Sequence, residues 1–193
     1  MSDTTTTRPT RRPRADSLRN RELLLEAAAA VFGAGGPDAS LEAVAKRAGV
    51  GIGTLYRHFP TREALFEAVY RHEVEHLAEL AERFSGEAAP VDALRRWLHA
   101  NVQLVATKKG MLATLALATV KRPELYAYSF DRLTRAIGLL LQRAVAAGEV
   151  RADVAPEELL RALVGMCHMN DQPGWQDGVH RLLDIFVDGL RIR

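Results

Sequence analysis

The sequence predicts an all-α protein of about nine helices, and three features of its 193 residues favour this fold class. Alanine, leucine, arginine and glutamate are abundant and aromatic residues make up only 6% of the chain, a composition that favours helices. Apolar residues recur at spacings of three and four over most of the chain, and no segment alternates between apolar and polar residues as a strand does. Proline or glycine marks the ends of most of these periodic segments.

A polar arm is expected to precede the first helix. Residues 1–16 are rich in Thr, Arg, Pro and Asp without apolar periodicity, so they are predicted to form a disordered basic arm. Asp16 or Ser17 can cap a helix that runs to about Ala34. Two roles for the arginines of the arm stay open: contact with a minor groove or phosphates, or improved solubility alone. These arginines are Arg8, Arg11, Arg12 and Arg14.

A helix-turn-helix motif is predicted over residues 40–59. Its first helix can begin after Ser40, whose hydroxyl is suited to capping, and can end at Gly49, because glycine readily adopts the left-handed conformation that follows many helices. In the second helix Leu55 and Phe59 are expected to face the core and to leave polar side chains outward. Such a motif can place its second helix in the major groove of DNA.

Six further helices are expected after this motif, which brings the total to nine. Thr61 is a suitable N-cap for the first of them, and Pro123 and Pro156 begin two others, since proline is tolerated in a first helical turn. The expected ranges are about 61–84, 91–107, 111–120, 123–147 and 156–168, and from Gly174 or Trp175 to near the end.

Positive charge is concentrated at the end of the chain that carries the helix-turn-helix. The net charge is only +2, yet residues 1–65 hold ten Lys and Arg against seven Asp and Glu. Residues 66–193 hold sixteen against seventeen. A surface that contacts phosphates needs such a local excess.

Cysteine usage and hydropathy bound the location of the protein. The single cysteine, Cys167, excludes an intramolecular disulfide framework and fits a reducing compartment. No apolar run approaches the roughly 18 residues that span a bilayer. We therefore expect a soluble cytoplasmic protein with no membrane partner.

Four short motifs give the N-terminal third of the chain a specific resemblance. They are Ala48-Gly49-Val50, Gly53-Thr54-Leu55-Tyr56, His58-Phe59 and Arg62-Glu63-Ala64-Leu65, preceded by an apolar helical run over residues 21–32. Together they resemble the DNA-binding segment of TetR/AcrR-family transcriptional regulators, over roughly residues 18–75. The resemblance implies a helix-turn-helix DNA-binding domain over residues 17–64 and a helical effector-binding and dimerisation domain over residues 65–193.

The resemblance also implies which side chains meet a double-stranded DNA operator. It points to Ile52, Gly53, Thr54, Tyr56, Arg57, His58 and Arg62. Ser40 is added on physical grounds, because its hydroxyl and the helix N-terminal amides can hold a phosphate. Alternatives stay open for Tyr56, as a half-buried packing residue, and for Arg57, as a solvated surface charge. The family frequently has Ser-Lys where this chain has Gly51-Ile52, so apolar contact by Ile52 or readout of DNA shape is expected there.

A homodimer is expected, because one helix-turn-helix reads too few base pairs for useful specificity. The resemblance implies dimerisation through the last two helices in a four-helix arrangement. The alternative is that their apolar residues serve the core of the single chain, and both uses can hold on different faces. Leu159 and Val164 add to the apolar area of the first of these helices. The predicted interface residues are Leu160, Leu163, Val179, Leu182, Leu183, Phe186, Val187 and Leu190.

An effector site is expected in the second domain, where apolar helices carry few polar groups, as in small-molecule cavities. The resemblance implies that a bound ligand moves the long helix after the helix-turn-helix. An ordinary core role is the alternative for each residue. The predicted lining is Trp97, Asn101, Leu104, Met111, Leu115, Tyr126, Phe130, Met166 and Cys167.

The run Met166-Cys167-His168-Met169 is not interpreted as a metal site. Ligands on one helical face need spacings of three or four, which only Met166 and Met169 satisfy. No metal and no other cofactor is therefore expected.

The function predicted from these features is that of a dimeric, sequence-specific DNA-binding regulator. We expect a repressor that a small, largely apolar ligand releases from a palindromic operator. An enzyme is not expected, since the sequence has no phosphate-binding Gly-Lys-Ser/Thr loop, no paired-His motif and no Gly-x-Ser-x-Gly. The alternative is a helical protein-interaction adaptor that does not use its helix-turn-helix.

Overall fold

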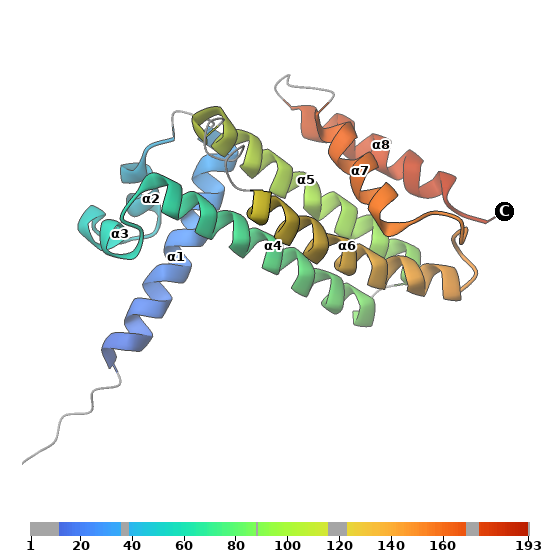
Figure 1. Cartoon of the computed structure of the whole chain (residues 1–193), viewed down its shortest axis with the longest axis horizontal. Helices are drawn as coiled ribbons and strands as arrows, with labels where there is room; N and C mark the ends of the chain where they lie inside the picture. The colour runs from blue at the N-terminus through green and yellow to red at the C-terminus, as the bar shows by residue number, and fades with distance from the viewer. Residues whose placement is uncertain (1–11, 36–38, 88, 116–122, 169–173, 193) are drawn as a thin grey trace, which may run out of the picture.

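The computed structural model describes residues 12–35, 39–87, 89–115, 123–168 and 174–192, and these ranges form eight α-helices and no β-strand (Figure 1). The predicted all-α class is confirmed. The helices are α1 (Arg12–Gly35), α2 (Leu41–Arg47), α3 (Ile52–His58), α4 (Arg62–Glu87), α5 (Pro90–Leu115), α6 (Pro123–Ala146), α7 (Pro156–His168) and α8 (Trp175–Gly189).

One helix fewer is present than predicted, because α5 continues through Lys108, Lys109 and Gly110 to Leu115. The separate helices expected over 91–107 and 111–120 are therefore wrong as far as Leu115, and residues 116–120 lie outside the described ones. A glycine inside a helix costs only about 1 kcal/mol relative to alanine. Packing of α5 against α4 and α6 outweighs so small a cost.

Helix α1 begins at Arg12, one turn earlier than the predicted start at Asp16 or Ser17. Pro13 lies in its first turn, where the missing N–H has no intrahelical partner and proline is tolerated. Residues 12–16, expected in the disordered arm, thus belong to the helix. Arg8 and Arg11 of the arm lie outside the described residues, as do the side chains of Arg12 and Arg14.

The core has two parts that meet along α4. The first joins α1, α2 and α3 to the beginning of α4, where Leu65, Phe66 and Val69 are buried. The second begins at Val74 and fills the space between α4 and the four helices that follow it. Tyr70 lies between the two parts and packs against both. We call the first part the head and the second the body.

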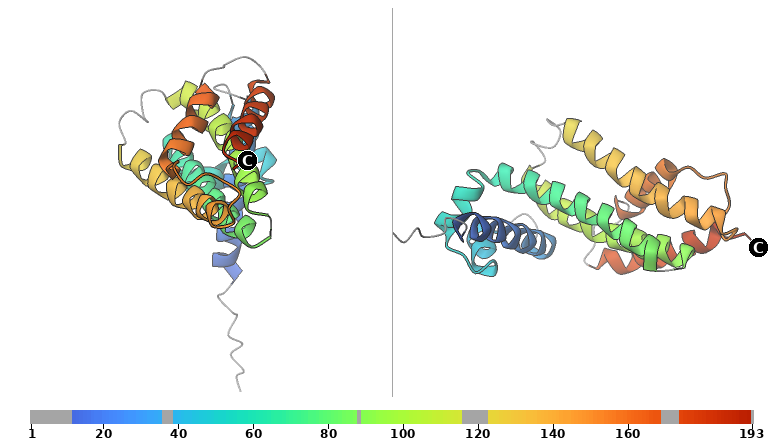
Figure 2. Two further views of the ribbon diagram at one scale, coloured as in Figure 1. Left: turned by 90° about the vertical axis from the view of Figure 1, so that its right-hand side faces the viewer. Right: turned by 90° about the horizontal axis from the view of Figure 1, so that it is seen from below.

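The head lies at one end of the molecule, and α4 extends from it along α5 and α6 (Figures 1 and 2). Helices α7 and α8 pack mainly on α5 and α6, with the C-terminus at the end far from the head. Helix α1 also contacts α5, and Gly33 permits a close approach there. A Cβ at this position would lie 3.0 Å from Gln103 Nε2 and 3.3 Å from Thr107 Oγ1.

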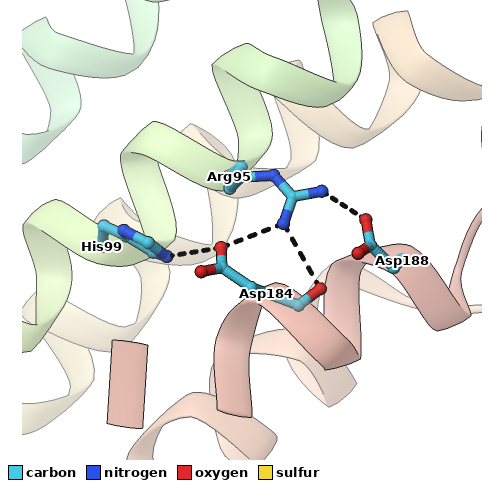
Figure 3. Close-up of polar contacts among 4 residues, drawn as sticks. All are labelled: Arg95, His99, Asp184 and Asp188. Carbon is cyan, nitrogen blue, oxygen red and sulfur yellow. Dashed lines mark hydrogen bonds and ion pairs between the residues drawn. The ribbon is translucent and has the colours of Figure 1, made fainter. Parts of the chain in front are cut away.

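A polar cluster fixes α8 on α5 (Figure 3). Arg95 donates from Nη1 to Asp184 Oδ1 at 2.9 Å and from Nη2 to the Asp188 carboxylate. His99 Nε2 lies 3.0 Å from the same Asp184 oxygen. The Arg95 guanidinium holds the pKa of Asp184 below its ordinary value, so this carboxylate stays charged in neutral solution.

Among the helices described, none is both long enough and apolar enough to cross a membrane.

Candidate nucleic-acid interface

Helix α2 is fixed at its start by the capping residue predicted from the sequence. Ser40 has extended backbone angles, and its Oγ accepts a hydrogen bond from the Ala43 amide at 3.1 Å. The cap satisfies one of the amides that a helix leaves unpaired in its first turn. The Ser40 hydroxyl is exposed and keeps its own proton, so it can still donate to a phosphate oxygen.

The turn between α2 and α3 depends on the left-handed conformation of Gly49, with φ at +70°. The Val50 amide donates to the Ala45 carbonyl at 3.0 Å and the Gly49 amide donates to Lys46 at 3.2 Å. These bonds satisfy carbonyls at the end of α2 and reverse the chain within three residues. Any other residue at 49 would be strained there, so the predicted role of this glycine is confirmed.

The predicted inward face of α3 is also confirmed. Leu55 is fully buried and Phe59, directly after the helix, is nearly so, and both pack in the head core with Leu41 and Val44 of α2. Because both helices share this core, α2 and α3 are held as one unit. The orientation of α3 is thereby set by its apolar side.

The opposite face of α3 is open to solvent. Ile52 is 37% exposed and Tyr56 is 46% exposed, and Gly53 between them has no atom within 4 Å of where a Cβ would lie. Thr54 and His58 are half-buried at the edges of this face. The face therefore offers an aromatic ring, an aliphatic chain and bare backbone, which suit thymine methyl groups and close approach to a base pair.

Arg57 folds back along α3 instead of extending outward. Its Nε donates to the Gly53 carbonyl at 3.2 Å and its Nη2 donates to Thr54 Oγ1 at 3.1 Å. The side chain remains exposed, so its charge is still available to a phosphate. The contact also fixes the orientation of the Thr54 hydroxyl.

Arg62, predicted as a contact on the next helix, lies in a different environment from the α3 residues. Its Nη2 donates to the Ala39 carbonyl at 2.7 Å in a partly buried position. Its guanidinium carbon lies 5.7 Å from the centre of the Phe32 ring and 5.1 Å from that of Phe66. The sequence carries no signal for the bond to Ala39, because this partner lies 23 positions away in the chain.

The predicted dimer residues separate into two groups. Leu182 is 49% exposed and Phe186 is half-buried, so both can meet a partner. Val164, which the sequence also placed in this apolar area, is 41% exposed. Sequence reasoning missed Ile185, which is 69% exposed, although it follows Leu182 at helical spacing. The other six predicted residues lie in the core of the single chain: Leu160, Leu163, Val179, Leu183, Val187 and Leu190.

Most of the predicted effector residues whose side chains are described pack in the core of the body. Trp97 and Asn101 are linked by a hydrogen bond from Asn101 Nδ2 to the Trp97 carbonyl at 3.1 Å. Burial raises the pKa of the Cys167 thiol to about 11, so it stays protonated. Trp97, Asn101, Leu104 and Cys167 are buried, Phe130 and Met166 half-buried and Tyr126 exposed. The side chains of Met111 and Leu115 lie outside the described ones.

The fold and the open face of α3 define a class: an all-helical protein with a helix-turn-helix head suited to DNA and a separate helical body. Residues 24–69 match the model for bacterial regulatory proteins of the tetR family. Residues 89–192, more than half of the chain, match that for the C-terminal domain of SbtR-like transcriptional regulators. The chain therefore belongs to the TetR family of transcriptional regulators.

Individual relatives agree with this assignment. A TetR regulator from Streptomyces coelicolor, SCO0520, is 40% identical, and the superposition covers 89% of this chain and 98% of that one at a TM-score of 0.80. A TetR regulatory protein from Mycobacterium vanbaalenii is 33% identical, with 93% and 99% covered and a TM-score of 0.70. The transcriptional repressor LfrR of Mycolicibacterium smegmatis is 38% identical over 134 residues, and that match spans 65% of each chain.

Proposed function

We propose that this TetR-family regulator is a cytoplasmic homodimer that represses transcription from a palindromic operator until a small, largely apolar ligand releases it. The observation that carries the proposal is the division of α3 into a buried side at Leu55 and an open side at Ile52, Gly53 and Tyr56. A helix that packs on the core with one side and is exposed to solvent on the other is suited to insertion into a major groove. The relative LfrR is described as a transcriptional repressor, which supports repression as the mode of action here.

Base contacts are assigned to the open side of α3. Tyr56 and Ile52 supply apolar contact with thymine methyl groups, and Gly53 admits the backbone of α3 close to the base edges. Ser40, Thr54, Arg57 and His58 are assigned to phosphates, which set the register of the protein on the duplex. Residues 17–64 then form the DNA-binding domain.

Dimerisation is assigned to the outward side of α7 and α8. Val164, Leu182, Ile185 and Phe186 expose apolar surface there that the described part of the chain leaves open. Burial of such surface in a two-fold interface would remove it from water and place two heads side by side. The buried members of the predicted interface support this surface from beneath.

Ligand response is assigned to residues 65–193, which contain the whole body. Contacts of α4 with both cores allow a change in the body to reach the head. A ligand acts as an inducer only if it binds the arrangement that cannot hold the operator more tightly than the one that can. The assigned lining keeps the residues predicted from sequence: Trp97, Asn101, Leu104, Met111, Leu115, Tyr126, Phe130, Met166 and Cys167.

The test is selection of bound duplexes from a random DNA pool by the purified full-length protein, followed by sequencing. We expect an enriched palindrome with half-sites about one helical turn apart. The Tyr56→Ala protein, run in parallel, should enrich this motif weakly or not at all. A folded wild-type protein that enriches no motif at low salt would support the adaptor alternative instead.

A further inference from the structure

We propose that Arg62 is a positioning residue for DNA recognition: its hydrogen bond to the Ala39 carbonyl holds the two ends of the helix-turn-helix together, and its charge does not serve a phosphate contact. We call this contact the clasp. The inference rests on the proposed DNA-binding function and reassigns one residue that the sequence places among the contacts.

The clasp is a hydrogen bond that closes a loop around the whole motif. Arg62 Nη2 donates to the Ala39 carbonyl at 2.7 Å, across 23 positions of the chain. Ala39 lies just before the cap of α2, and Arg62 is the first residue of α4. Everything between them is α2, the turn, α3 and the short connection to α4. One bond therefore joins the entry of the helix-turn-helix to its exit.

The surroundings of the guanidinium add a second constraint. It lies over the rings of Phe32 in α1 and Phe66 in α4, and these two rings meet edge to face with centres 4.5 Å apart. Both rings are buried, as is Ala39. The Arg62 side chain thus touches α1, α4 and the entry to α2 at one point.

The chemistry of arginine suits this position better than that of lysine. A guanidinium is planar, so it can lie against aromatic rings and donate in its own plane to a carbonyl at the same time. A lysine ammonium has the same charge but lacks the plane. A phosphate contact depends mainly on the positive charge, whereas the clasp depends on the planar shape of the guanidinium. Substitution by lysine keeps the charge and removes the plane, so it distinguishes the two roles.

The consequence concerns the orientation of α3. Because α2 and α3 share the head core through residues such as Val44 and Leu55, they are held as one unit. The unit is joined to α1 and α4 by apolar packing, which is non-directional, and by the Arg21 guanidinium of α1, which lies 5.4 Å from the centre of the Phe59 ring. The bond from Arg62 adds a directional hydrogen bond at the entry to α2. Loss of the bond is expected to widen the range of orientations that α2 and α3 adopt relative to α1 and α4. The preference for the operator over other DNA sequences should therefore fall.

The experiment compares Arg62→Lys and Arg62→Met with the wild type on two duplexes: the selected palindrome and a scrambled duplex of equal length. Arg47→Met is the matched control, since it removes the same charge from an exposed side chain of α2. Affinities are measured by fluorescence anisotropy over a series of salt concentrations. Circular dichroism at the same temperature identifies any variant that has lost its helices.

We expect Arg62→Lys to lose about tenfold in affinity for the palindrome, the size of one charge-assisted hydrogen bond. Its affinity for the scrambled duplex and its salt dependence should match the wild type, because its charge is kept. The proposal is overturned if Arg62→Lys binds like the wild type while Arg62→Met weakens both duplexes equally. In that case the slope of log K against log salt should fall by about 0.9 per chain, as for a lost phosphate contact.

Hydrogen exchange supplies a readout that requires no DNA. Amides of residues 41–58 should exchange faster in both Arg62 variants than in wild type, while Arg47→Met should leave them unchanged. Unaltered exchange in both Arg62 variants would overturn the clasp. A wild-type protein that selects no palindrome contradicts the proposed function, and the exchange experiment still decides the role of Arg62.

Discussion

The indole of Trp97 donates a hydrogen bond from Nε1 to the backbone carbonyl of Leu77 at 2.7 Å, and both side chains are buried. This bond joins the first half of α5 to the middle of α4. The head packs on the beginning of α4. The bond therefore ties the helix that presents the DNA-binding motif to the interior of the body. Any ligand that displaces Trp97 would act directly on this joint.

Replacement of Trp97 by phenylalanine should lower the free energy of unfolding by about 2 kcal/mol, through loss of the hydrogen bond and a smaller ring in a closed core. Urea denaturation followed by circular dichroism measures the change. Trp175→Phe is the matched control, because Trp175 is only half-buried and packs at the edge of the body. Equal losses in both variants would contradict the role given to the Trp97 bond.

Substitution of Tyr56 by alanine should reduce operator affinity by about tenfold while stability changes by less than about 0.5 kcal/mol, because the ring is exposed and supports no core. The neighbouring substitution Leu55→Ala should instead act mainly on stability. It removes a fully buried side chain and should cost about 2–5 kcal/mol of stability. Anisotropy and urea denaturation separate the two effects, and a stability loss at Tyr56 would favour its interpretation as a packing residue.

Cys167 should react slowly with a thiol reagent such as DTNB at pH 8. With a pKa of about 11 in the folded protein against an ordinary 9.0, its thiolate fraction is about a hundredfold smaller than in the unfolded chain. The reaction in native buffer should therefore be at least about a hundredfold slower than in urea. A similar rate in both solutions would show that the thiol is not buried.

The same pKa shift sets a direction for stability against pH. The folded state holds the Cys167 proton more tightly than the unfolded state does, because burial disfavours the thiolate. Its contribution is complete below the ordinary pKa of 9.0 and is lost as the pH rises through about 11. Cys167→Ala should flatten the fall of stability over that window.

Ile185→Glu should convert the proposed homodimer into a monomer, because a charge in the centre of an apolar interface would be buried without a partner. Sedimentation equilibrium measures the mass. Leu18→Glu is a matched control, since Leu18 and Ile185 are both 69% exposed and Leu18 lies on α1 in the head. An Ile185→Glu protein that remains dimeric would place the interface elsewhere.

The local features of the fold could be predicted from the sequence because they depend on neighbouring residues. Helical periodicity and end signals located α6 and α7, and Ser40 and Thr61 cap α2 and α4 as predicted. The break expected at Gly110 is wrong, since a helix packed on both sides tolerates a glycine that would weaken an isolated one. That packing is a property of the folded chain.

The candidate sites were harder to predict because they depend on contacts between distant residues. Leu182 and Leu183 are adjacent in an apolar stripe, yet one is half exposed and the other fully buried. The pattern alone could not separate a surface for a partner from the core beneath it. Arg62 has the charge and position of a phosphate contact in the sequence, and only the fold brings it to Ala39.

The central claim, that the open face of α3 serves a dimeric reader of DNA, is tested most directly by titration of the selected palindrome with the protein across a salt series. The account predicts saturation at two chains per duplex, a steep fall of affinity with salt and a clear preference over a scrambled duplex. Equal affinity for both duplexes, or one chain per palindrome with the same affinity for an isolated half-site, would contradict it.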